Sequence, residues 1–376
     1  MNSKEKLLIY PFDIQSSPIV RHINLMGQYE LTALASPNGW GFSSKDAGYV
    51  DGGEDIGLNV NSNFNELIDS VDTVLFMESY NKLDIKKLVY SKIQVAADKG
   101  KNIICTLNLE DEFFNEINEK CMSKGKYLKY FSPFKGLNKS SDMSNLDSLL
   151  EITVPVVFVL GAAERTQKFE IQLSLRENLI EAGYKVSQVG SRHYCEMLGI
   201  HSFPDFMYST CLSETKKIIL FNNYIKKIEL DEQPDIIVIG IPGGLMPFNK
   251  EFNNNFGIFA YEISQAILPD IAIFSTLYGD YLPVYFEKIS LSIRYKLGFE
   301  TDFFNLSNNI FDFNGSKMLK SMQYLTVESE LVDLKKQNFK NNNIPVTNIL
   351  NREDAKTLSA NVIRKLTGNA DIVPAI

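Results

Sequence analysis

The chain has 376 residues, of which 44% are hydrophobic and 22% are charged, and its formal net charge is −8. This length favours two domains, and the composition is typical of a globular protein with an ample core. An acidic chain without a dense Lys/Arg stripe argues against nucleic-acid binding. The apolar stretch at the N-terminus breaks at Pro11, too early for a signal peptide, and no apolar run reaches the roughly 18 residues of a spanning helix. We therefore expect a cytoplasmic protein with no membrane partner.

The first part of the chain alternates short apolar runs with helix-like stretches, which is typical of a parallel α/β sheet. It lacks the G-x-G-x-x-G pattern of dinucleotide-binding domains. We predict a Rossmann-like N-terminal domain over residues 1–126 and a polar linker over residues 127–150. The predicted strands are 7–11, 29–35, 71–77 and 102–107, and the predicted helices are 16–25 and 83–99.

A second α/β series follows and predicts a C-terminal domain over residues 151–376. Its predicted strands are 155–160, 185–189, 235–241, 270–276, 323–327 and 344–349, and its predicted helices are 170–182, 210–228, 256–267, 282–297 and 353–366.

One segment of this series gives conflicting signals. Apolar residues alternate with polar ones from Phe169 to Leu175, and a period of two indicates a strand. The steps from Leu175 to Leu179 and Ala182, with Gly183 as a stop, indicate a helix instead. We predict a helix, because an apolar strand is expected on each side of the segment.

The stretch VFVLGAAERTQKFEIQL, residues 158–174, has the outline of a phosphate-binding loop. An apolar strand ends at Gly161, and Lys168 follows at the predicted start of a helix. Free N–H groups and the dipole of a helix N-terminus attract anions, and a lysine adds charge. The spacing corresponds to a G-x5-GK loop, one residue longer than the common P-loop.

Three positions depart from a working P-loop. Gln167 stands in place of the second glycine, and Phe169 replaces the Ser or Thr that would hold Mg²⁺. The strand DIIVIGI carries Gly240 where a Walker B acid would stand. Without both Mg²⁺ ligands, ordinary ATP hydrolysis is not expected. We thus predict a P-loop-NTPase-like second domain with degenerate Walker motifs.

Polar groups follow several predicted strands at the edge where ligands bind in open α/β sheets. Arg165, Lys168 and Arg192 would form a cationic pocket for a phosphate or carboxylate. The alternative is a set of solvated loop charges and turn glycines. The candidate ligand-binding residues are Gly161, Arg165, Thr166, Gln167, Lys168, Gly190, Ser191, Arg192, Gly243 and Gly244.

A metal site is not expected. His193, Cys195, His201 and Cys211 lie within nineteen residues, but their spacing fits no common zinc motif. Metal binding at this stretch stays a third, weaker alternative. No nucleophile–base pair can be identified by spacing, so no catalytic residue is assigned.

The segments GAAERTQKFEIQLSLRENLIEAGYKVSQVGSR, DIIVIGIPGGLMPFN and IPVTNIL resemble the peptide maturation system proteins of clostridial natural-product clusters. That family is encoded beside Cys-rich precursor peptides and radical SAM maturases. More distantly, the second domain is similar to a group of two-domain proteins that pair a Rossmann-like N-terminal domain with a P-loop C-terminal domain, some of which are N-acyltransferases acting on acidic amino acids. Lys168 falls on their P-loop lysine.

The resemblance implies an accessory or binding protein in the maturation of a ribosomally made peptide. Its expected partners are the precursor peptide and a radical SAM maturase, and a homodimer is left open. The cofactor is unknown, with a nucleotide or another phosphate-containing ligand as the candidate. The alternative function is an acyl- or amide-forming transferase or a nucleotide-dependent enzyme that uses the modified loop.

Overall fold

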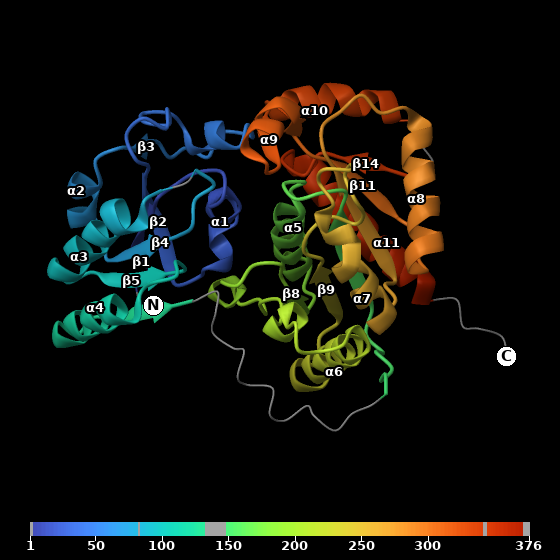
Figure 1. The fold of residues 1–376 in the computed structure, drawn as a ribbon, viewed down its shortest axis with the longest axis horizontal. Coiled ribbons are helices and arrows are strands. Elements are labelled where there is room, and N and C mark those ends of the chain that lie inside the picture. Colours follow the sequence, from blue (N-terminus) through green and yellow to red (C-terminus); the bar gives the residue numbers. More distant parts are fainter. Residues whose placement is uncertain (1–2, 82, 132–147, 341–343, 371–376) are drawn as a thin grey trace. The chain divides into compact units, whose positions relative to one another are not determined.

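A computed structural model describes residues 3–81, 83–131, 148–340 and 344–370, with the backbone alone for 369 and 370. The chain divides into two compact units (Figure 1). Unit 1 comprises Met1–Lys135 and His193–Gly199, and unit 2 comprises Gly136–Arg192 and Ile200–Ile376. Each unit is built around one six-stranded parallel sheet, so the predicted α/β class with a parallel sheet in each half is confirmed.

The sheet of unit 1 has the strand order β3-β2-β1-β4-β5-β6, and all its pairings are parallel. This is the doubly wound Rossmann order, in which strands are added outward from β1 first on one side and then, from β4 on, on the other side. The strands are β1 (Glu5–Tyr10), β2 (Tyr29–Ala35), β3 (Val60–Asn61), β4 (Thr73–Phe76), β5 (Asn102–Cys105) and β6 (Leu128–Tyr130).

Apolar side chains of three helices cover one face of this sheet. Phe64 of α2, Ile93 of α3 and Ile117 of α4 join the core cluster with Leu8 and Val74 of the strands. The helices of unit 1 are α1 (Ser17–Arg21), α2 (Phe64–Leu67), α3 (Tyr90–Asp98) and α4 (Asp111–Ser123).

The sheet of unit 2 has the order β14-β11-β10-β7-β9-β8, again with parallel pairings throughout. The strand before the candidate loop, β7, therefore lies between β10 and β9. The strands are β7 (Val156–Gly161), β8 (Val186–Val189), β9 (Ile236–Gly240), β10 (Ile271–Thr276), β11 (Phe303–Leu306) and β14 (Val346–Thr347), and an antiparallel pair is formed by β12 (Asn309–Asp312) and β13 (Gln323–Thr326).

Alternate residues of β7 point into two different cores, as a buried strand requires. Val157 and Val159 pack with α5 and α11, whereas Phe158 packs with α6, α7 and α8 on the other face. In Figure 1, α5 lies beside β8 and β9. The helices of unit 2 are α5 (Lys168–Glu181), α6 (Glu214–Glu232), α7 (Ile258–Ala266), α8 (Pro283–Leu297), α9 (Phe313–Leu319), α10 (Ser329–Lys336) and α11 (Arg352–Ala370).

The boundary between the two halves differs in detail from the prediction. Leu128–Tyr130, at the start of the predicted linker, forms β6 and pairs with β5. Most of the remaining linker, residues 132–147, lies outside the described residues. The segment His193–Gly199 belongs to unit 1 although unit 2 surrounds it in sequence. His193 Nε2 lies 3.0 Å from both the Thr106 carbonyl oxygen and Glu78 Oε1, and these contacts tie the segment to unit 1.

Candidate anion-binding loop of unit 2

The candidate loop joins β7 to α5, and the predicted helix is confirmed. The alternation of apolar and polar residues does not mark a buried and an exposed face here, because the residues from Lys168 to Leu175 are all buried. Ile171, Leu175 and Leu179 enter the core with β7 and α11, at the spacing of one helix face. The polar residues between them are buried as well, so apolar alternation here does not indicate a two-sided strand.

The loop backbone has the shape that glycines usually provide. Arg165 and Gln167 have φ angles of 59° and 62°, in the left-handed region that side chains disfavour. Gln167 thus keeps a glycine-like backbone at the position where a P-loop carries its second glycine. Gly161 is needed for a different reason, because a Cβ there would contact Thr166 Oγ1 and lie 2.9 Å from the carbonyl oxygen of Ser275.

The loop carbonyl groups are held by side chains from other elements. Asn254 Nδ2 donates to the Ala162 oxygen over 3.3 Å, and Asn309 Nδ2 donates to the Arg165 oxygen over 3.0 Å. Ser275 Oγ donates to the Thr166 oxygen. Within the described residues, no hydrogen bond uses the N–H groups of Ala163, Glu164, Gln167 or Lys168. The carbonyl groups of Ala162, Arg165 and Thr166 are thus satisfied, whereas these backbone donors are unused among the described residues.

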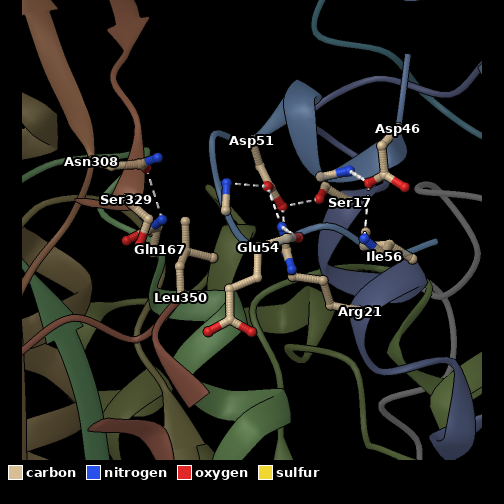
Figure 2. A network of polar contacts seen from close by, with 12 residues as sticks. Ser17, Arg21, Asp46, Asp51, Glu54, Ile56, Gln167, Asn308, Ser329 and Leu350 are labelled. Carbon is tan, nitrogen blue, oxygen red and sulfur yellow. Dashed lines mark hydrogen bonds and ion pairs between the residues drawn. The ribbon is translucent and has the colours of Figure 1, made fainter. Parts of the chain in front are cut away.

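The side chain of Gln167 ties the loop to the segment after β11. Its Nε2 donates to Asn308 Oδ1 over 2.9 Å, as Figure 2 shows. Gln167 Oε1 is buried and has no hydrogen-bond partner among the described residues. Gln167 therefore lacks the conformational freedom of a glycine, and its side chain instead holds the loop through the hydrogen bond to Asn308.

Lys168 is the first residue of α5 and is only 8% exposed. Its Nζ donates to the carbonyl oxygens of Ala163, over 3.1 Å, and of Gly243. Burial lowers the pKa of Lys168 from its ordinary 10.5 to about 8, while Glu164 opposes the shift and Arg192 adds to it. The ammonium group is therefore poorly solvated and lies against two strand ends.

Arg192 follows β8 and approaches the same region. Its guanidinium group lies over the ring of Phe169, 5.6 Å from the ring centroid. Gly190, two residues earlier, donates its N–H to the carbonyl oxygen of His201 and so fixes the start of this loop. Ser191 is half-buried beside it.

The loop after β9 completes the arrangement. Gly243 has a φ of 74°, and its carbonyl accepts from Lys168. A Cβ at Gly244 would lie 2.6 Å from Asn254 Nδ2 and 2.8 Å from the Ala162 oxygen, so only glycine fits there. All ten predicted ligand-binding residues thus lie in unit 2, at the last residue of β7 or after β7, β8 or β9. Lys168 directly links two of these three segments.

Sequence reasoning missed the residues that support the loop. Asn254, Asn305, Asn308 and Asn309 lie far from the loop in sequence, and nothing in their spacing relates them to it. The apolar run before Asn308 could have indicated β11, and with it a further strand end at this edge. Gln172 was also missed; it is fully buried, and its amide occupies the space where a side chain at Gly240 would begin.

The strand ends of unit 1 carry polar groups that satisfy one another. Asp13 accepts from the backbone N–H groups of Gln15 and Tyr80. Figure 2 shows Asp51 accepting from Ser17 Oγ and from the guanidinium group of Arg21. These buried contacts bind the loops of unit 1 to one another.

The described residues contain no group of three or more His, Cys, Asp or Glu side chains placed to hold a metal ion. His193 and Cys195 belong to unit 1, whereas His201 belongs to unit 2 and contacts Glu232 Oε1 at 2.5 Å. Over the described part of the chain, no helix is long and apolar enough to cross a membrane.

Comparison with known proteins shows the fold. A DUF1611 family protein from Anabaena variabilis matches 96% of this chain and 100% of its own, with 10% identity and a TM-score of 0.56. An amine dehydrogenase from Mycobacterium smegmatis matches 34% of this chain and 39% of its own, with 17% identity and a TM-score of 0.27. A homoserine dehydrogenase from S. aureus matches 35% and 33%, with 12% identity and a TM-score of 0.28. No family model and no curated protein matches the chain.

Proposed function

We propose that unit 2 binds an anionic ligand at the 161–168 loop, and that the protein serves as an accessory or binding protein in the maturation of a ribosomally made peptide. One observation carries the binding proposal: the carbonyls of Ala162, Arg165 and Thr166 accept from surrounding side chains, while several loop N–H groups are unused within the described part of the chain and the Lys168 ammonium lies against the same loop. Backbone donors and a lysine at a helix N-terminus form a favourable site for phosphate or carboxylate.

The same geometry argues against ordinary Mg²⁺-dependent ATP hydrolysis. Such a reaction needs a hydroxyl ligand at position 169 and an acid near position 240. Phe169 is 5% exposed and has no ligating atom, and the amide of Gln172 occupies the space beside Gly240. Recognition of an anion, rather than cleavage of its phosphates, is the function that these residues support.

The peptide-maturation setting is supported by the sequence resemblance. In that setting a precursor peptide would bring the anion as a side chain, a terminal carboxylate or a bound cofactor. A radical SAM maturase is the expected enzyme partner. The similarity to the DUF1611 family protein supports the two-unit fold, and its description names no substrate.

A second candidate is an acyl- or amide-forming transferase. It is favoured by Lys168, whose pKa of about 8 leaves the buried side chain mostly protonated near pH 7, as stabilisation of an anion requires. In that reaction Lys168 would stabilise a phosphate or a developing oxyanion at the loop. Product formation from an acyl donor and an amino acid, lost in Lys168→Met, would favour this candidate.

The binding proposal is tested by calorimetric titration of ATP, ADP and inorganic pyrophosphate into the full chain. Lys168→Met keeps the length of the buried side chain and removes its charge. We expect it to weaken binding by roughly 10- to 150-fold, the value of one hydrogen bond to a charged group. Lys288→Ala, at an exposed position of α8, is the matched control and should bind as the wild type does.

The peptide arm uses a Cys-rich precursor peptide of the kind encoded beside members of the peptide maturation family. Binding of this peptide by the wild type, and competition between peptide and pyrophosphate, would place both at the same loop. An absence of heat with all three phosphates and with the peptide would refute the proposal.

A further inference from the structure

We propose that Arg192, held on the ring of Phe169, supplies the positive charge that Mg²⁺ supplies in an ordinary P-loop, so that unit 2 binds a diphosphate group without a divalent cation. This inference rests on the proposed anion-binding function. It goes further by naming the ligand class and a pair of residues that determine specificity.

The first observation concerns the place of the usual metal ligand. Phe169 is the second residue of α5, directly after Lys168, and its buried ring offers a π face instead of a hydroxyl. The guanidinium group of Arg192 lies over that face at 5.6 Å from the centroid. An aromatic face attracts a cation at this separation, and arginine is the side chain that most often stacks in this way. A metal ligand has thus been replaced by a support for an organic cation.

The second observation concerns the other metal-binding position. At the end of β9, the amide of Gln172 fills the space of any side chain at Gly240. Gln172 is fully buried, and its Oε1 has no hydrogen-bond partner among the described residues. Gln188 of β8 donates to the Gln172 carbonyl and has a similarly unpaired Oε1. Mg²⁺ sites in nucleotide-binding proteins use carboxylates together with phosphate oxygens, and these neutral amides bring no such charge.

The third observation is an imbalance of charge. Within the described part of unit 2, Arg192 is half-buried, has no carboxylate at ion-pair distance and donates no hydrogen bond. Lys168 donates to two backbone carbonyls, and Glu164 is the carboxylate that raises its pKa. Two partly or fully buried cations that act on each other electrostatically are costly unless an anion joins them.

The ligand class follows from the number and position of these cations. Lys168 lies at the start of α5 and Arg192 in the loop after β8, and Arg192 acts electrostatically on Lys168. We infer that each meets one phosphoryl group of a diphosphate. The planar fork of arginine can hold two phosphate oxygens at once. A Mg²⁺ ion on the same diphosphate would compete for these oxygens and be repelled by Arg192. The free diphosphate should therefore bind more tightly than its Mg²⁺ complex.

The test is a titration of inorganic pyrophosphate, and separately of ADP, into the full chain in EDTA and in excess Mg²⁺. We expect wild-type binding to be as tight or tighter in EDTA. Arg192→Ala should weaken binding in EDTA about tenfold or more, and Arg192→Lys should weaken it less. Phe169→Leu keeps an apolar side chain without the ring and should weaken binding roughly two- to fivefold. Arg364→Ala, on the exposed side of α11, is the control and should change nothing.

The outcomes separate this inference from the proposed function. Binding that requires Mg²⁺ in the wild type, or binding in EDTA that is lost in Lys168→Met and unchanged in folded Arg192→Ala, overturns the inference and leaves the anion-binding function. No binding of either anion in either condition overturns both. Thermal melting checks the fold of each variant, and Arg192→Lys and Phe169→Leu carry the test if Arg192→Ala does not fold.

Discussion

The energetic effect of the left-handed backbone at Gln167 can be measured by comparing the free energies of unfolding of two substituted variants. Both Gln167→Gly and Gln167→Ala remove the hydrogen bond to Asn308 and the buried, unpaired Oε1. These losses are common to the two variants, so they cancel when the variants are compared. What differs is the φ angle of 62°, which glycine adopts freely and alanine does not.

The expected difference follows from two opposing effects. Alanine in the left-handed region costs roughly 1–2 kcal/mol, and glycine loses roughly 0.5–1 kcal/mol more than alanine through the entropy of the unfolded chain. The Gly variant should therefore be more stable than the Ala variant, by roughly 0.5–1 kcal/mol in the free energy of unfolding. The same change at an ordinary helical position would favour alanine, so the sign of the difference is diagnostic.

The assay must follow unit 2 by itself. Trp40 is the one tryptophan of the chain and lies in unit 1, so tryptophan fluorescence reports on the wrong unit. Hydrogen exchange of peptides covering α5, measured across a urea series, gives the stability of the helix that follows the loop. An Ala variant as stable as the Gly variant, or more stable, would refute the left-handed loop geometry.

Three further predictions concern buried groups of unit 2. Because the pKa of Lys168 is lowered to about 8 in the folded protein, the unfolded chain binds this proton more readily, and the free energy of unfolding should rise from about pH 8 to 10.5. ADP affinity should fall by up to about tenfold per pH unit above 8, because binding uses the charged form. Urea denaturation and calorimetry measure the two trends, and both should vanish in Lys168→Met. Gly240→Ala should destabilise unit 2 by about 1–3 kcal/mol through its contact with the Gln172 amide, and less in a Gln172→Ala background; equal costs in both backgrounds of this double-mutant cycle would exclude the contact. Burial raises the pKa of Glu262 above 4.5, so its ionisation opposes folding as pH rises through that raised pKa, and Glu262→Gln should melt at a higher temperature at neutral pH with little change in acid.

The fold could be predicted from the sequence wherever local signals agreed. The segment 29–35 was predicted as a strand and forms β2 with the same bounds. The stretch from β7 through Lys168 was predicted because an apolar strand, a glycine and a basic helix start lie within thirteen residues. Period analysis failed for residues 169–175, since it assumes one exposed face and the first turns of α5 have none.

The features that the sequence did not predict depend on contacts between residues far apart in the chain. Gln167 and Asn308 are 141 positions apart, and Arg165 and Asn309 are 144 apart, so no local pattern relates them. The segment His193–Gly199 joins unit 1 through contacts with Glu78 and Thr106, far earlier in the chain. Such contacts depend on the completed sheets, which a reading of neighbouring residues does not contain.

The supports of the loop also bear on the proposed binding of an anion without a metal ion. Asn254, Ser275 and Asn309 come from three separate elements and hold the loop by the carbonyl groups of residues 162, 166 and 165. The loop therefore loses its conformational entropy when unit 2 folds, and binding of a ligand costs little further entropy. In a loop that needs Mg²⁺, the ion helps to order the ligand and the loop together. Here the loop is ordered by asparagine and serine, and the remaining requirement is charge, which Lys168 and Arg192 can supply.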